Sequence, residues 1–181
     1  MTTQEFPPQK ERIEIEAANG VALRQLTEED DQPYFDLVNS NRGHLSQFGD
    51  KTSEKYPDVE SVRRRREQAD RQGIYRFGIW ADNAFVGTVN LSPDSDGQSA
   101  ELGYWIGNQY AGHGYARRAT QALASYAFER LGLDLVYAEV AIGNVASRKS
   151  LERAGFKFVD EGKTNWYFEL KPSDDINRLT P

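Results

Sequence analysis

The chain of 181 residues contains no cysteine, one methionine and two histidines. The lack of cysteine excludes disulfide bonds, thiolate metal sites and a cysteine nucleophile. His44 and His113 lie far apart in the sequence and have no cysteine beside them, so the sequence predicts no metal site.

Long hydrophobic runs are also lacking. No window approaches the roughly eighteen apolar residues that a membrane-spanning helix needs. The first twelve residues lack the basic and then apolar layout of a secretory signal peptide, and the sequence therefore predicts a cytoplasmic protein without a membrane partner. The formal net charge of −6 argues against direct nucleic-acid binding and favours a cationic substrate such as an amine.

The length and the 38% content of hydrophobic residues predict a single domain with a full core. We expect a mobile N-terminal arm over residues 1–12, the domain over residues 13–171 and a C-terminal tail over residues 172–181. Hydrophobic periodicity, caps and turn residues predict the order of elements. We expect a hairpin around Asn19-Gly20, a helix after Thr27, a helix over 58–72, a hairpin around Asp82-Asn83, a central strand ending at Ile106, a long helix to Leu131, a strand over 135–141, a helix from Asn144 to about Ala154 and a closing hairpin.

Four consecutive arginines, Arg63 to Arg66, occur on the helix predicted over residues 58–72. Such a run invites an interpretation as a nucleic-acid or ribosome contact. Glu60, Glu67 and Asp70 lie three or four residues from these arginines, and pairs at that spacing are typical of a solvated helix face. We therefore interpret the run as a solvated surface.

The stretch from Ala100 to Arg117 reads as a strand, a glycine turn and the start of a helix. Gly112 and Gly114 can adopt backbone angles that other residues avoid, and they carry no side chain that would keep a ligand at a distance. A helix N-terminus offers unpaired N–H groups and a partial positive charge. The stretch therefore predicts an anion site, most simply for phosphate.

Three phosphate-binding motifs compete for this geometry. The P-loop is excluded because no Lys-Ser or Lys-Thr follows the second glycine. The dinucleotide fingerprint is half present, since Arg117 stands where its third glycine belongs. The third motif fits: Gln109-x-x-Gly112-x-Gly114 resembles the acetyl-CoA signature of the GNAT N-acetyltransferases, and the preceding Glu101-Leu-Gly-Tyr-Trp-Ile is similar to the RimJ/RimL branch.

Two later segments extend this resemblance, which covers roughly residues 21–170. They are Gly143 to Arg148 and Glu152 to Phe156, and they resemble the second half of the family's core. The resemblance implies an α/β (mixed α+β) acyl-CoA N-acyltransferase fold. We expect a central mixed, mostly antiparallel sheet of about six or seven strands flanked by about four helices.

The resemblance also implies acetyl-CoA as cosubstrate, no metal, and a primary amine as acceptor, with a protein N-terminus among the candidates. A homodimer stays open. The cosubstrate-binding residues that it implies are Trp105, Ile106, Gln109, Gly112, His113, Gly114, Tyr115, Ala116, Asn144 and Arg148.

Glu101 is the candidate general base, because a protonated amine must lose its proton before it attacks a thioester. In the families this chain resembles, a glutamate at this strand position often has that role; a purely structural ion pair is the alternative. Alternation places Trp105 on the same face, where we expect it to wall the acceptor pocket. Many relatives carry a tyrosine that protonates the leaving thiolate at the position where this chain has Leu151, so Ser147 and Ser150 are the remaining candidate acids.

Two other functions remain open from the sequence. One is a non-catalytic acyl-CoA-binding module of the same fold, and the other is a nucleotide-binding regulator.

Overall fold

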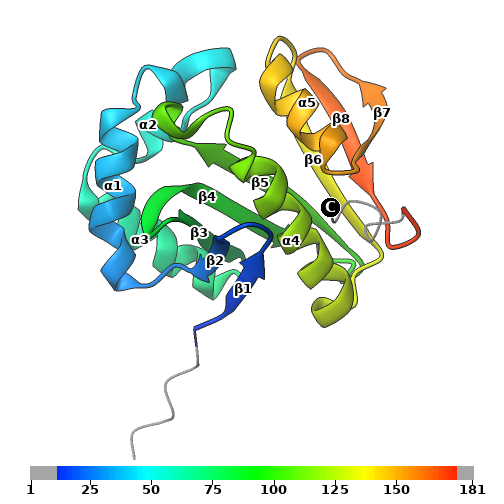
Figure 1. Ribbon diagram of the computed structural model, residues 1–181, viewed down its shortest axis with the longest axis horizontal. Helices are drawn as coiled ribbons and strands as arrows, with labels where there is room; N and C mark the ends of the chain where they lie inside the picture. Colours follow the sequence, from blue (N-terminus) through cyan, green and yellow to red (C-terminus); the bar gives the residue numbers. More distant parts are fainter. Residues whose placement is uncertain (1–11, 175–181) are drawn as a thin grey trace, which may run out of the picture.

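An eight-stranded sheet runs through residues 12–174, the part of the chain that the computed structural model describes (Figure 1). The strand order is β1-β2-β3-β4-β5-β6-β8-β7. All neighbouring strands are antiparallel except β5 and β6, which are parallel and joined by helix α4. The strands are β1 (Glu14–Ala17), β2 (Val21–Gln25), β3 (Tyr75–Ala81), β4 (Ala84–Pro93), β5 (Ser99–Ile106), β6 (Leu135–Ala141), β7 (Lys157–Glu161) and β8 (Asn165–Leu170).

Five α-helices and three 3₁₀ helices accompany the sheet in the described residues. The mixed, mostly antiparallel architecture confirms the expected fold class. The sheet is one strand wider than the largest number expected, and the additional helix is the single turn α2. The helices are α1 (Asp31–Ser40), α2 (Thr52–Lys55), α3 (Val59–Arg71), α4 (Tyr115–Leu131), α5 (Val145–Arg153), η1 (Glu28–Asp30), η2 (His44–Gly49) and η3 (Asn108–Tyr110).

The two faces of the sheet are covered by different helices (Figure 1). On one face, α4 buries Ala119, Leu123 and Ala127 against the sheet. On the other face, α1 and α3 bury Tyr34 and Val62 in a separate hydrophobic cluster. Each large aliphatic side chain buried in this way contributes about 1.5–3 kcal/mol through removal of apolar surface from water. The side chains of the central strands therefore alternate between two distinct environments.

The predicted hairpin turns are confirmed. Asp82 and Asn83 have φ angles of 49° and 61°, and Asn19 and Gly20 have φ angles of 56° and 73°. In the two-residue connection between β3 and β4, two successive residues with positive φ give the type of tight turn whose twist matches that of the flanking strands, whereas Asn19 and Gly20 belong to a three-residue connection.

Helix α3 lies within one residue of its predicted range at each end. The Asp58 side chain accepts a hydrogen bond of 2.7 Å from the backbone N–H of Ser61, and Gly73 follows the helix with a φ of 71°. These residues satisfy the free backbone groups at the two helix ends.

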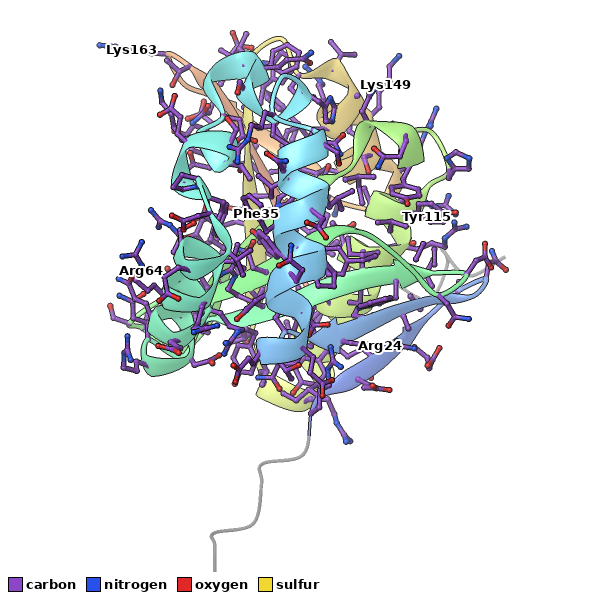
Figure 2. All side chains as sticks on the ribbon, turned by 90° about the vertical axis from the view of Figure 1, so that its left-hand side faces the viewer. Arg24, Phe35, Arg64, Tyr115, Lys149 and Lys163 are labelled. Carbon is purple, nitrogen blue, oxygen red and sulfur yellow. The ribbon has the colours of Figure 1, made fainter. Side chains whose placement is uncertain are left out.

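The interpretation of the arginine run as solvated surface is wrong for Arg66. Its guanidinium donates two hydrogen bonds, of 2.8 and 2.9 Å, to the carboxylate of Asp31, and this bonding raises the pKa of Arg66. Asp31 is buried at the start of α1 and needs a cationic partner there, which sequence spacing within α3 could not reveal. Arg63 pairs with Glu60 at 3.4 Å as expected, and Arg64 projects from α3 at the surface (Figure 2).

Residues 1–11 and 175–181, which hold most of the predicted arm and tail, lie outside the described residues. Arg12, the last residue of the predicted arm, forms an ion pair with Asp30 at 2.6 Å. Across residues 12–174, no helix has the length and apolar character that crossing a membrane requires.

Candidate active site

Strands β5 and β6 are paired only at their beginnings. Ser99 to Glu101 lie beside Leu135 to Tyr137, and the remaining residues of both strands are not paired with each other. Strand β5 then leads through η3 into the glycine turn, and β6 leads into α5. The N-termini of α4 and α5 therefore follow the diverging ends of two neighbouring strands (Figure 1).

The glycine turn offers a row of free backbone donors. Gly112 and Gly114 have φ angles of 81° and 74°, and a Cβ added to either residue would meet no atom within 4 Å. The N–H groups of residues 112–117 form no hydrogen bond within residues 12–174; the first bond of α4 runs from Arg118 N to Gly114 O at 3.1 Å. Open space and unpaired donors at a helix N-terminus fit a pyrophosphate group.

Three side chains hold this turn in place. His113 Nδ1 lies 3.2 and 3.0 Å from the carbonyl oxygens of Tyr110 and Ala111, and its ring stacks on Tyr115 at 5.5 Å between centroids. Arg118 donates a hydrogen bond of 2.8 Å to the carbonyl oxygen of His113 and lies over the Tyr115 ring. The turn is thus fixed by contacts that leave its N–H groups free.

Glu101 lies where β5 and β6 cease to be paired, on the face of the sheet opposite α4. It is directly opposite Ser92 of β4 and Tyr137 of β6. Partial desolvation raises the pKa of Glu101, and the nearby carboxylates of Glu139 and Asp94 raise it further. A carboxylate with a raised pKa is better matched to proton transfer near neutral pH than an ordinary glutamate.

Ser147, in the first turn of α5, has a partner that the sequence did not reveal. The Tyr104 hydroxyl lies 2.8 Å from Ser147 Oγ. Burial raises the pKa of Tyr104, although hydrogen bonding to Ser147 and Ser150 opposes this change. Strand alternation could have indicated Tyr104, because it places this residue on the face opposite Glu101, toward the helices that follow both strands.

Asn144 caps α5 as the sequence predicts. Its side chain accepts a hydrogen bond of 3.2 Å from Ser147 N. The cap directs the start of α5 and keeps Ser147 in the first turn beside Tyr104.

The five remaining residues predicted to bind the cosubstrate lie in different parts of the structure. Trp105 lies on the Glu101 face and lines a pocket between the sheet and α3. Ile106 packs with the cluster on the α4 face, while Gln109 is exposed in η3 and Ala116 lies in the first turn of α4. Arg148 is engaged elsewhere: it pairs with Glu152 at 2.9 Å and lies 4.8 Å above the Trp166 ring.

These features can be compared with known proteins. The model of the GNAT acetyltransferase domain matches residues 21–157. The chain belongs to the GNAT acetyltransferase family. Within the described residues, no group of three or more histidine, aspartate or glutamate side chains is arranged to hold a metal ion.

One relative and two solved structures illustrate the position of this acetyltransferase in the family. YdaF of Bacillus subtilis (strain 168), which is named as a ribosomal N-acetyltransferase, is 32% identical over 149 residues, covering 79% of this chain and 80% of YdaF. The structure of RimL, a ribosomal L7/L12 alpha-N-protein acetyltransferase in complex with coenzyme A, has a TM-score of 0.81 at 17% identity, over 90% of this chain and 100% of RimL. Mycobacterium smegmatis RimJ in complex with a CoA disulfide has a TM-score of 0.78 at 20% identity, over 93% of this chain and 92% of RimJ. At these identities the two structures show the shared fold.

Proposed function

We propose that this acetyltransferase moves the acetyl group of acetyl-CoA to a primary amine by direct attack within a ternary complex. The observation that carries the proposal is the row of N–H groups over residues 112–117, which have no partner in the described chain, together with the open space beside Gly112 and Gly114. Acetyl-CoA supplies a thioester-activated acetyl group and a pyrophosphate that such a row can bind. Direct attack is the simplest route because the chain has no cysteine to form an acyl-enzyme.

Two candidate groups for proton transfer lie on opposite faces of β5. Glu101 accepts the proton of the incoming amine, directly or through a water molecule, from the α3 side of the sheet. Ser147, oriented by Tyr104, donates a proton to the departing thiolate from the α5 side. A thiol of ordinary pKa, about 8.5, leaves with only modest help, so a hydroxyl is a sufficient donor.

The acceptor includes protein N-termini in this proposal. Support comes from YdaF, which is named as a ribosomal N-acetyltransferase, and from the RimL and RimJ folds. The proposed binding residues for acetyl-CoA remain those of the glycine turn together with Trp105, Ile106 and Asn144. Because Arg148 is already paired with Glu152, we expect its contribution to be smaller than that of the turn.

A thiol-release assay tests the proposal. The protein is supplied with acetyl-CoA and a panel of amines and peptides with free N-termini, and calorimetry measures CoA binding in parallel. We expect CoA release that depends on the acceptor. Tight CoA binding without turnover on any acceptor would instead favour the non-catalytic module. Stabilisation of the fold by NAD or ATP, but not by acetyl-CoA, would favour a nucleotide-binding regulator.

A further inference from the structure

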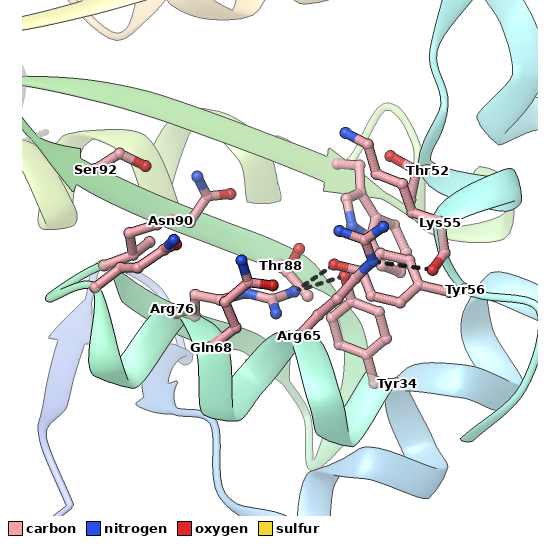
Figure 3. A pocket seen from close by; sticks show the side chains of 14 residues that line it. Tyr34, Thr52, Lys55, Tyr56, Arg65, Gln68, Arg76, Thr88, Asn90 and Ser92 are labelled. Atoms are coloured by element: carbon pink, nitrogen blue, oxygen red, sulfur yellow. Dashed lines mark hydrogen bonds between the residues drawn. The ribbon is translucent and has the colours of Figure 1, made fainter. Parts of the chain in front are cut away.

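A pocket of about 300 Å³ lies between α3 and strands β3, β4 and β5 (Figure 3). It is on the Glu101 face of the sheet, because Thr88, Asn90 and Ser92 alternate along β4 and lie opposite Trp105, Gly103 and Glu101. Side chains directly opposite one another on paired strands share a face. The pocket therefore adjoins the candidate base and is the natural place for the acceptor.

The wall of the pocket carries charge of one sign. Three of its side chains are cations, namely Lys55, Arg65 and Arg76, and three are amides, namely Gln68, Gln72 and Asn90. Among residues 12–174, no aspartate or glutamate lines it. This is unexpected in a chain whose formal net charge is −6, and it indicates that the pocket binds something other than a simple cation.

Arg76 is held at the base of the pocket by two phenols. One terminal nitrogen, Nη2, donates hydrogen bonds to the hydroxyls of Tyr34 at 2.9 Å and Tyr56 at 2.8 Å (Figure 3). Its Nε and Nη1 atoms donate no hydrogen bond to any other residue of the described chain. The Nη2 atom is thus occupied, and the N–H groups of Nε and Nη1, which point in different directions, are available to a ligand.

The charge of Arg76 has no counter-ion within residues 12–174. Burial raises the pKa of Tyr34 well above its usual range, so this partner stays a neutral phenol. A partly buried cation without a carboxylate partner is costly to keep in a fold. An anionic group that accepts a hydrogen bond from Nη1 or Nε would complete the site.

The other end of this face has the opposite charge. Glu101 lies near Glu139 and Asp94, which raise its pKa. In the strand register, Arg76 and Glu101 are two strands and two residues apart, which places their Cα atoms roughly 12 Å from each other. An ammonium group is favoured at the Glu101 end and an anion at the Arg76 end.

We propose that the acceptor is an amine that also carries a carboxylate or phosphate group, and that Arg76 binds this anionic group while the amine faces Glu101. Lys55 and Arg65 add positive charge at the pocket wall. This inference rests on the proposed function, because it names the class of acceptor at the same site. It refines the simple expectation of a cationic substrate to that of an amine with an acid group.

Matched pairs of acceptors test the inference. The pairs are 6-aminohexanoate and its amide, an aminoalkyl phosphate and its alcohol, and tripeptides that differ only by glutamate or glutamine at the second position. At one pH, the acidic member of at least one pair should show a kcat/KM roughly 10- to 100-fold above that of its neutral partner. The pairs distinguish carboxylate from phosphate, and small compounds from peptides.

Substitutions of pocket residues test whether these side chains cause the preference for acidic acceptors. Arg76→Gln should reduce the acidic-to-neutral ratio of kcat/KM by roughly tenfold or more. Because Arg76 is tied to two tyrosines, the double variant Lys55→Gln/Arg65→Gln at exposed positions gives a second test, with a reduction of several-fold expected. Arg64→Gln is the matched control: it removes an exposed arginine of the same helix that does not line the pocket, and should leave the ratio unchanged (Figure 2).

A binding readout independent of turnover completes the test. Succinate should raise the melting temperature of the wild-type protein more than succinamide does at equal ionic strength, and Arg76→Gln should abolish this difference. Equal turnover of acidic and neutral acceptors, with no specific effect of succinate, would overturn the inference and leave the proposed function intact. Absence of turnover on every acceptor, with no binding of acetyl-CoA, would overturn both.

Discussion

The hydroxyl of Tyr104 on β5 lies 2.8 Å from the Oγ of Ser147 on α5. This hydrogen bond joins β5 to the helix that follows β6, across the region where the two strands are no longer paired with each other. Either hydroxyl can be the donor in this hydrogen bond. Tyr104 can therefore orient the hydroxyl of Ser147, and it can also return a proton to Ser147 Oγ after Ser147 has given one up. In the proposed mechanism, this pair takes the place of a tyrosine at position 151, where Leu151 is fully buried.

Tyr104→Phe tests the role of this pair. The variant keeps the ring and removes only the hydroxyl, so we expect kcat to fall about tenfold while the affinity for acetyl-CoA stays the same. Ser147→Ala should lower kcat at least as much. Tyr126→Phe on α4 is the control, because Tyr126 contacts Tyr75 and Phe77 and should not affect the rate. A Tyr104→Phe enzyme with full kcat and reduced thermal stability would show that the pair is structural.

The glycine turn gives a prediction about cosubstrate binding. Gly114→Glu places a side chain and a negative charge where we propose the pyrophosphate binds, so calorimetry should detect no CoA binding. The left-handed backbone also strains a residue with a side chain, at a cost of about 1–2 kcal/mol in stability. Gly20→Glu controls for this strain, because Gly20 has nearly the same φ, 73° against 74°, and equally open surroundings in the β1–β2 turn. Both variants should lose stability, and only Gly114→Glu should lose CoA; normal CoA binding by Gly114→Glu would mean that the phosphate site lies elsewhere.

Local signals in the sequence were sufficient for most of the fold. Turn residues such as Asp82 and Asn83, caps such as Asn144 and the 3.6-residue periodicity of α4 act within a few residues, and the structure confirms each of them. Contacts between distant segments were not accessible. The pairing of Arg66 with an aspartate 35 positions away depends on how α1 and α3 pack.

The same distinction between local signals and contacts of distant segments applies to the candidate site. Its glycine turn is contiguous in sequence and could be identified from the motif. The Tyr104–Ser147 contact and the cluster around Arg76 unite residues far apart in the chain. Neither has a spacing pattern, because the sheet register and the helix packing bring their members together.

The contact between α1 and α3 predicts a difference between two acidic residues. Asp31→Asn removes the buried partner of Arg66, whose side chain is only 11% exposed, and leaves the cation without compensation. Breaking such a pair should lower the free energy of unfolding by on the order of 3 kcal/mol. Glu60→Gln, which removes an exposed partner of Arg63, should change it by less than about 1 kcal/mol. Urea denaturation of both variants measures the difference; equal effects would contradict the role of Asp31.

Glu101 should reduce stability while it supports catalysis. Its pKa in the folded protein is raised above the ordinary value of 4.5, so the native state holds this proton to a higher pH than the unfolded chain does. Stability therefore falls as the pH rises through the window that starts near the ordinary pKa, and it stays lower above that window. Glu101→Gln removes this cost, so the variant should melt at the same or a higher temperature than the wild type at pH 7 to 8, and the difference should vanish at acidic pH. A variant that melts clearly lower at neutral pH would indicate a stabilising ion pair.

The pH dependence of the rate decides whether Glu101 is the base. Glu101→Gln should lower kcat/KM by roughly 10²-fold or more near neutral pH while CoA binding survives. The deficit should narrow as the pH rises from about 6 to 10, because more of the amine then arrives already neutral. Glu139→Gln serves as the companion variant, because it removes one of the charges that raise the pKa of Glu101. The rise of kcat/KM on the acidic side of its pH profile should therefore move to lower pH. Parallel pH profiles of kcat/KM for the wild type and Glu101→Gln, with no shift for Glu139→Gln, would remove Glu101 from the mechanism. The titration of the amine itself would then govern the rate.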